Sequence, residues 1–267
     1  MIEAKGVVDG HNVAEPSWLA LRSTADERAR EAALPLVKSL AERLAPGPAH
    51  GIDIGTGTGA NHAYLSARLG VPVRWTVLDH DADLLGHAAH RNATGLLAEI
   101  ADLPVLIGDG TPGTFLTCSA VLDVVGEADL DALAAVLVTR RLPALFSLSV
   151  TGEVVIGPED PLDGSIAEAF NAHQRRGARP GPDAPRRLAE RLPVGWLTEV
   201  RTHWLLGARD DASLLEGYLR ERAAVAVESD PELAGPVNQW LERRMTELAA
   251  GCLTVEVGHV DQLVLPA

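Results

Sequence analysis

The chain has 267 residues, of which 46% are hydrophobic, a length that suits one substantial α/β domain with a lid. Its formal net charge of -14 argues against a nucleic-acid partner, because such binding draws on a basic surface and on the release of counterions. Two cysteines are too few for a disulfide framework, and neither an apolar signal segment nor a membrane-spanning run is present, so we expect a cytoplasmic protein with no membrane partner.

The predicted elements start with a helical cap over residues 1–48. Apolar residues recur at helical spacing between Trp18 and Leu44, and the pattern ends at Pro46-Gly47-Pro48. Short apolar runs then indicate buried strands, separated by patterns typical of helices. The strands are predicted at 50–54, 75–78, 105–107, 115–120 and 144–150, and the helices between them at 60–69, 81–92 and 127–140. This alternation predicts a doubly wound α/β fold with a mostly parallel sheet.

The composition changes after Thr151, where glycines and prolines bracket a short predicted helix at 165–175. We interpret residues 151–198 as an insertion or substrate lid after the fifth strand. The C-terminal part, 199–267, carries predicted strands at 200–206 and 253–265 and predicted helices at 212–227 and 236–249. The whole chain is therefore expected to form a single domain with a seven-stranded sheet, in which residues 49–150 are the cofactor-binding core.

A glycine-dense turn follows the first predicted strand. Residues 50–61 read His-Gly-Ile-Asp-Ile-Gly-Thr-Gly-Thr-Gly-Ala-Asn, a buried strand that leads into a helix. Gly55, Gly57 and Gly59 allow a sharp bend with positive φ and let a ligand reach backbone N–H groups. Asp53 stands inside the apolar strand, where a carboxylate needs fixed donors from the turn or from a ligand ammonium. The turn predicts a nucleotide-like cofactor, although a plain strand-to-helix turn can also use glycines.

The glycine spacing separates two kinds of cofactor. It reads G-x-G-x-G with an acid two positions before the first glycine, whereas a dinucleotide fingerprint reads G-x-G-x-x-G. This pattern resembles motif I of the class I S-adenosylmethionine (SAM) methyltransferases, and the resemblance covers Pro16 to Val150 in strand order and motifs. It implies SAM as the cofactor, the turn as the holder of its amino-acid end, and an antiparallel last strand. It also implies that Arg22 pairs with the SAM carboxylate; a surface arginine is the alternative.

The ends of the predicted strands map the site, because ligands of an open parallel sheet bind beyond the carboxyl ends of its strands. The second strand ends at Asp79, whose carboxylate suits the two hydroxyls of a ribose. Helix capping is the alternative for Asp79 or Asp81, and we favour Asp79 as the ribose ligand and Asp81 as the cap. The predicted third strand ends at Asp109 and Gly110, where the acid suits the exocyclic amine of adenine or belongs to an ordinary Asp-Gly turn.

The fourth predicted strand ends at Ser119, in a run that resembles the fourth motif of the same family, although Gly113-Thr114 replaces the acid that is common ahead of that strand. Asp123 follows among apolar residues, where burial would raise its pKa and suit it to proton abstraction; a salt-bridged acid is equally compatible. In the insertion, His173 is a candidate base or substrate anchor, against the favoured alternative of a solvated helix face.

The function that these residues predict is SAM-dependent methyl transfer to a small-molecule nucleophile, with O- or N-methylation favoured. An NAD(P)-dependent oxidoreductase and a non-catalytic protein of the same fold are the alternatives. No metal site is predicted, because His87 and His90 have no third ligand nearby in the sequence. The predicted catalytic residues are Asp123 and His173, and the predicted cofactor-binding residues are Arg22, Asp53, Gly55, Thr56, Gly57, Gly59, Asp79, His80, Asp109, Gly110 and Ser119.

Overall fold

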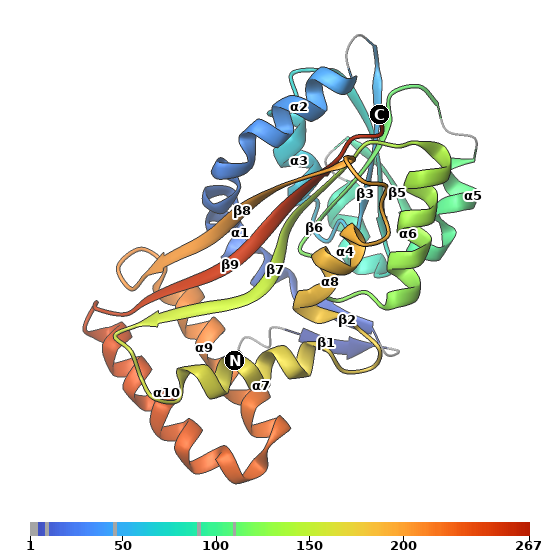
Figure 1. Cartoon of the computed structure of the whole chain (residues 1–267). Coiled ribbons are helices and arrows are strands. Elements are labelled where there is room, and N and C mark those ends of the chain that lie inside the picture. Colours follow the sequence, from blue (N-terminus) through green and yellow to red (C-terminus); the bar gives the residue numbers. More distant parts are fainter. Residues whose placement is uncertain (1–4, 9–10, 45–46, 90–91, 109–110) are drawn as a thin grey trace.

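The computed structural model describes residues 5–8, 11–44, 47–89, 92–108 and 111–267. Its main element is a seven-stranded sheet with the strand order β5-β4-β3-β6-β7-β9-β8 (Figure 1). The strands of this sheet are β3 (Ala49–Ile54), β4 (Val73–Asp79), β5 (Ala93–Leu97), β6 (Thr114–Ser119), β7 (Ala144–Gly157), β8 (Leu197–Gly207) and β9 (Thr254–Val264). A separate antiparallel pair, β1 (Lys5–Val8) and β2 (His11–Ala14), makes the N-terminal region less helical than we predicted.

The sheet is mostly parallel. Strands β3 to β7 run parallel to one another, and β9 lies antiparallel between β7 and β8. Strand β3 pairs with β4 on one side and with β6 on the other, so the strand order reverses between β3 and β6. The carboxyl ends of these strands therefore flank the switch point of the sheet. These features confirm the predicted doubly wound α/β fold, the seven strands and the antiparallel last strand. Strand β7 is the fifth strand of this sheet in chain order. The helical segment between β7 and β8 therefore lies where we predicted the insertion.

Helices cover both faces of the sheet. Successive residues of a strand point to opposite faces, so a strand with consecutive apolar residues needs apolar partners on both sides. Phe115 and Leu145 belong to a buried cluster that includes residues of α2 and α3, whereas the neighbouring Leu116 and Phe146 belong to a cluster with α5 and α6. Burial of these apolar side chains is the main force that holds the layers together. The helices are α2 (Leu34–Leu44), α3 (Ala60–Ser66), α4 (Ala82–Ala89), α5 (Leu103–Ile107), α6 (Glu127–Arg140) and α8 (Ala184–Ala189).

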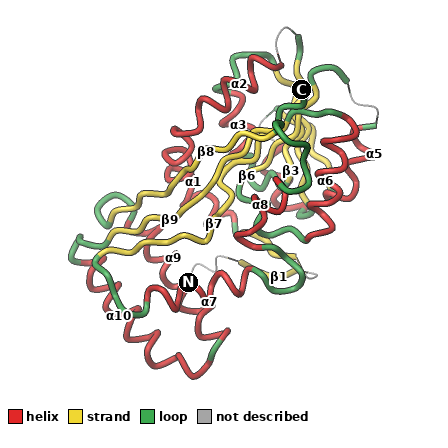
Figure 2. Tube along the Cα trace, in the orientation of Figure 1, coloured by secondary structure: helices red, strands yellow, loops and turns green. Residues whose placement is uncertain are grey.

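The long strands β7, β8 and β9 extend beyond the rest of the sheet, and a second group of helices packs on the extension (Figure 2). These helices are α1 (Pro16–Arg30), α7 (Asp163–Gln174), α9 (Ala212–Ser229) and α10 (Ala234–Ala249). Their buried cluster includes Trp18, Trp204 and Trp240. The N-terminal helix α1 and the C-terminal third of the chain therefore share one apolar core, although they are far apart in the sequence.

The predicted third strand is wrong. Residues 105–107 belong to the short helix α5, and the third strand is β5, at residues 93–97. Val105 is 85% exposed, so this apolar run is not part of a buried strand. Strand β5 lies at the edge of the sheet, is only half-buried and contains Gly95, so it lacks the dense apolar character of a central strand. The third strand end therefore precedes Asp109 by a complete helix.

The other predicted elements lie where the sequence placed them, with shifted ends. Strand β7 runs past Val150 to Gly157, and its last residues pair with the start of β9. Thr151 is therefore still part of the sheet, and the connecting segment starts after Gly157. Among the described residues, no helix is both long enough and apolar enough to cross a lipid bilayer.

Candidate active site

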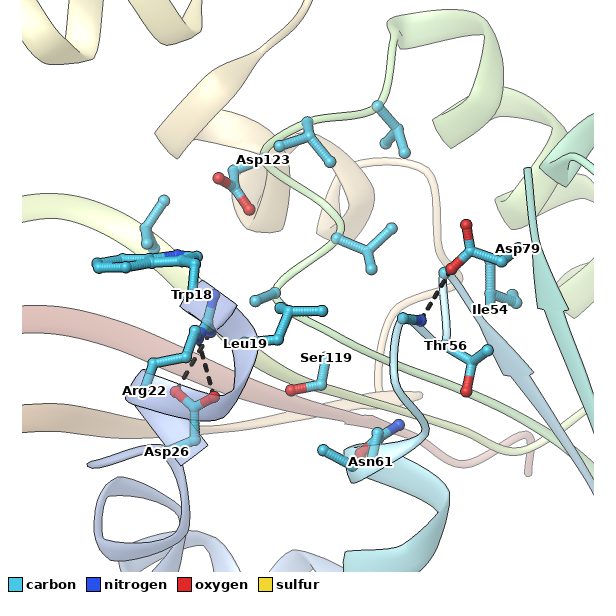
Figure 3. A pocket seen from close by; sticks show the side chains of 18 of the residues that line it. Trp18, Leu19, Arg22, Asp26, Ile54, Thr56, Asn61, Asp79, Ser119 and Asp123 are labelled. Carbon is cyan, nitrogen blue, oxygen red and sulfur yellow. Dashed lines mark hydrogen bonds and ion pairs between the residues drawn. The ribbon is translucent and has the colours of Figure 1, made fainter. Parts of the chain in front are cut away.

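A cavity of about 600 Å³ opens where the strand order reverses. One side is formed by the residues that follow β3, β4, β5 and β6, which is where open α/β sheets bind their ligands. Residues of α1, α7, α9, β8 and β9 form the other side. Figure 3 labels several of the lining side chains. The predicted residues that line the cavity are Arg22, Gly55, Thr56, Gly57, Asp79, His80, Ser119 and Asp123.

The turn after β3 needs glycine for its conformation and for space. Gly55 and Gly57 have φ values of +60° and +54°, in the region that side chains disfavour. A Cβ on Gly55 would lie 2.8 Å from Val121 Cγ2, and a Cβ on Gly57 would lie 3.0 Å from Leu19 Cδ1. Leu19 of α1 and Val121 of the loop after β6 thus lie directly against the turn, and a side chain on either glycine would have to displace them.

Asp53 lies behind the turn and does not line the cavity. Its carboxylate is fully buried and accepts hydrogen bonds from Thr56 Oγ1 at 2.8 Å and from Asn61 Nδ2 at 2.6 Å. Burial raises the pKa of this carboxyl group to about 6, although both hydrogen bonds act in the opposite direction. Gly59, also outside the cavity lining, donates its N–H to Thr56 O at 2.9 Å. The donors that Asp53 requires are therefore side chains of the turn and of α3.

Asp79 joins the end of β4 to the glycine turn. Its Oδ2 accepts the N–H of Gly57 at 2.8 Å, and its Oδ1 accepts the N–H of Asp81 at 3.0 Å. His80 Nδ1 lies 3.6 Å from the same Oδ1. Asp81 in turn accepts the N–H of Asp83 at 2.8 Å, which confirms its predicted role as the cap of α4. Asp79 is thus held at the cavity wall in contact with the turn that we predicted to bind the cofactor.

A different acid from the one we predicted follows the third strand. Residues 98–100 come directly after β5 and line the cavity, so Glu99 occupies the strand-end position that we assigned to Asp109. The backbone N–H of Ala98 donates to Asp79 O at 3.0 Å, which fixes this wall next to the end of β4. Asp109 and Gly110 lie outside the described residues.

Ser119, the last residue of β6, and Asp123, in the loop that follows, both line the cavity. Between them, Ala120 has a φ of +55°, a conformation that non-glycine residues adopt mostly where the surrounding structure enforces it. Asp123 Oδ2 accepts a hydrogen bond from Gln174 Nε2 at 3.0 Å, and its buried Oδ1 has no partner within the described part of the chain. In Figure 3, Asp79 and Asp123 stand on opposite sides of the space.

Arg22 lines the cavity from α1, and its guanidinium is paired. Its Nε and Nη2 donate to the carboxylate of Asp26 at 2.9 and 3.2 Å, one helical turn along (Figure 3). Asp26 also accepts the indole N–H of Trp204 at 3.0 Å. A ligand carboxylate would therefore share Arg22 with Asp26. The i,i+4 spacing of this pair is visible in the sequence.

His173 is not among the residues that line the cavity. Its neighbours on α7, Phe170 and Gln174, do line it, whereas His173 Nδ1 lies 3.9 Å from Glu228 Oε1 of α9. The helix therefore presents one side to the cavity and turns His173 toward the partly exposed contact with α9. The structure does not bring this residue to the predicted catalytic position.

Several cavity residues from the C-terminal third were not predicted, among them Trp204, Tyr218, Arg222 and His259. The His259 ring lies 5.3 Å from the Trp204 ring, and its buried Nδ1 has no partner within the described residues. Burial, with a smaller effect of the Arg22 charge, lowers the pKa of His259 to about 3, so the imidazole is neutral at physiological pH. No local motif marks these positions, because only the pairing of β8 with β9 and the packing of α9 bring them to the site.

Comparisons with known proteins bear on the fold. No protein-family model matches the sequence, and no curated protein is significantly similar to it in sequence. A solved structure from Anaeromyxobacter dehalogenans, provisionally named a type II methyltransferase, matches with a TM-score of 0.50 at 15% identity, over 88% of this chain and 97% of that one. YcgJ from Bacillus subtilis matches with a TM-score of 0.49 at 15% identity, over 88% and 98%. A cyclopropane synthase from Mycobacterium tuberculosis matches with a TM-score of 0.44 at 15% identity, over 88% and 85%.

The fold can therefore be assigned to a class. The sheet has the antiparallel last strand that the resemblance implied, inserted between the fifth and sixth strands, and most of the chain matches the Anaeromyxobacter structure at the level of the fold. Dinucleotide-binding sheets have six strands in the order 3-2-1-4-5-6, without this insertion. The chain has the Rossmann-like fold of the class I methyltransferases.

Proposed function

We propose that this protein is a SAM-dependent methyltransferase that acts on an oxygen or nitrogen nucleophile of a small molecule. One observation carries the proposal: the glycine turn and Asp79 line the same cavity of a methyltransferase fold, and the N–H of Gly57 donates a hydrogen bond to the Asp79 carboxylate. The glycine spacing and the antiparallel β9 both disfavour an NAD(P)-dependent oxidoreductase.

The cavity residues fit the parts of SAM. The glycines of the turn at 55–57 carry no side chains, so the amino-acid end of the cofactor can approach the turn backbone closely, while Arg22 can share its fork with the carboxylate. Asp79 suits the ribose diol. Glu99 is placed to meet the exocyclic amine of adenine, in the position that we had assigned to Asp109. Apolar residues that suit the flat adenine ring line the same wall, namely Leu84, Ala98 and Ile100.

Bound SAM supplies an electrophilic methyl group on its sulfonium sulfur. What this chain adds is alignment, exclusion of water and a proton acceptor. Asp123 is the proposed base: its buried Oδ1 has no partner in the described structure, and Gln174 fixes the other oxygen. Trp18 and Phe170 add bulky apolar walls that limit the entry of water. The proton of the attacking hydroxyl or amine passes to Asp123, and His173 takes no part because it does not line the cavity.

A small acceptor suits the cavity, whose volume of about 600 Å³ lies within the range of ligand pockets. The segment between β7 and β8, residues 158–196, acts as a substrate lid in this proposal, because it contributes Phe170, Gln174 and Arg179 to the cavity wall. A cytoplasmic location stays a prediction that rests on cysteine use; neither Cys118 nor Cys252 is in a disulfide.

Thermal shift with SAM, S-adenosylhomocysteine (SAH) and NADH tests the proposed function. SAM and SAH should raise the melting temperature and NADH should not, since binding to the folded state alone stabilises it. Stabilisation by NADH and not by SAM would favour the oxidoreductase. Transfer of a labelled methyl group from SAM to a panel of small hydroxyl and amine compounds then separates an enzyme from a non-catalytic SAM-binding protein, which would bind SAM and label nothing.

A further inference from the structure

The C-terminal wall of the cavity contains a buried arginine with unpaired donors. Arg222 of α9 is 6% exposed and lines the cavity, yet its Nε and Nη1 have no hydrogen-bond partner within the described residues. Buried guanidinium groups are nearly always paired, because an unpaired buried charge is strongly unfavourable. By contrast, Arg22 in the same cavity is paired with Asp26. Arg222 therefore presents hydrogen-bond donors to the cavity for which the described residues supply no acceptor.

Two aromatic rings hold this guanidinium in place. Its Cζ lies 4.1 Å from the centre of the Phe170 ring and 4.2 Å from the centre of the Tyr218 ring. Contact with ring faces is favourable for a guanidinium and leaves the N–H groups, which lie in its plane, to meet an acceptor at the edge. The Tyr218 hydroxyl is buried beside this guanidinium, and burial raises the pKa of Tyr218 to about 12 against the opposing effect of Arg222, so the hydroxyl stays neutral and keeps its proton to donate.

The acids that line the cavity do not supply the missing acceptor. No ion pair joins Arg222 to any of them within the described residues, including Glu221, its neighbour on α9. The charge of Arg222 is thus left for a ligand.

We propose that the methyl acceptor carries a carboxylate, which Arg222 binds through its guanidinium fork with help from the Tyr218 hydroxyl. This inference rests on the proposed function and names its substrate class. A carboxylate matches the two parallel donors of an arginine and the single positive charge of this site, whereas a phosphate would bring more charge than one arginine balances. Apolar residues of the same cavity suit an acceptor with an apolar body, namely Trp18, Val150 and Val257.

A cationic acceptor is the opposing possibility, since aromatic rings also bind amines. Here the Phe170 and Tyr218 faces are already covered by Arg222, which would repel a second cation. A set of three ring compounds of similar size therefore separates the two possibilities. Benzoate carries the carboxylate, benzamide is its neutral counterpart, and benzylamine is a cation.

Calorimetry with these three compounds, in the presence and absence of SAH, tests the inference. Benzoate should bind at least about tenfold more tightly than benzamide or benzylamine. Arg222→Gln should remove this preference, and Tyr218→Phe should reduce it without abolishing it. Arg220→Gln is the matched control: Arg220 is on the same helix, exposed and paired with Glu216, so its loss should change nothing.

Three results would overturn the carboxylate site: equal binding of benzoate and benzamide, a preference for benzoate that survives in Arg222→Gln, or tighter binding of benzylamine. No detectable binding of benzoate at tens of millimolar would also overturn it. The SAH titration keeps the two proposals apart, because SAH binding without a benzoate preference removes only the carboxylate site. If SAH does not bind, the proposed cofactor is wrong, and the benzoate titration still decides whether Arg222 is an anion site.

Discussion

Replacement of Asp79 by asparagine is the sharpest test of the cofactor site. In the structure the Asp79 carboxylate accepts the N–H of Gly57 with one oxygen and the N–H of Asp81 with the other. Asparagine has the same shape but only one acceptor oxygen and no charge. It can keep one of these two contacts, and it cannot offer a carboxylate to both hydroxyls of a ribose. Asp79→Asn should therefore weaken SAH binding without removing the strand that carries it.

The size of the effect follows from the charge on the acceptor. A hydrogen bond to a charged group contributes about 1.5–3 kcal/mol, and its loss corresponds to a dissociation constant about 10- to 140-fold higher. Isothermal titration of SAH into both proteins measures this ratio directly. Asp81→Asn is the matched control, because it removes the same charge two residues away, while asparagine caps helix α4 about as well as aspartate.

The control should bind SAH like the unmodified protein. The loss of a charged hydrogen bond would change the dissociation constant by more than about twofold. If Asp79→Asn also binds SAH within about twofold of the unmodified protein, Asp79 is therefore not the ribose ligand. An equal loss in Asp79→Asn and Asp81→Asn would show a general effect of charge rather than a contact with the cofactor.

Two further predictions concern acids with different surroundings. Burial raises the pKa of Asp53 to about 6 in the folded protein, above its ordinary 3.8, so the stabilisation from this group is complete below the lower value and is lost as the pH rises through the higher one. Between about pH 4 and pH 7, the free energy of unfolding in urea should fall by about 2 kcal/mol relative to Asp53→Asn; parallel pH profiles would refute this. Asp123→Asn should reduce turnover of an identified acceptor about 100-fold, with SAH affinity unchanged in calorimetry. Unchanged turnover would exclude Asp123 as the base.

Central strands could be predicted from the sequence because their apolar character is strong and local. The runs at β3, β4 and β6 are buried on both faces by helices, and each is a short apolar segment bounded by polar or glycine residues. The edge strand β5 carries no such signal, since a strand with one neighbour and partial exposure can include Gly95 and still pair. The exposed apolar residues of α5, such as Val105, gave the stronger and misleading pattern.

The cavity residues at the strand ends, where we propose that the cofactor binds, could be predicted for a similar reason. The turn residues, Asp79 and Ser119 all stand at strand ends, and the topology of a parallel sheet brings strand ends together. Because the third strand was predicted too far along the chain, the prediction names Asp109 as the acid that follows it, whereas Glu99 follows β5 in the structure. The acceptor side could not be predicted, because Arg222 and His259 reach the cavity only through the packing of α9 and the antiparallel pairing of β9. Helical spacing alone did not show which side of α7 would face the cavity.

A crystal structure with SAH bound tests the central proposal most directly. The proposal predicts that the amino-acid end of SAH lies against the turn at 55–59, that its ribose hydroxyls bond to Asp79, and that its sulfur faces the space in front of Asp123. SAH bound elsewhere, or in this cavity with its ribose away from Asp79, would contradict the assignment of the site.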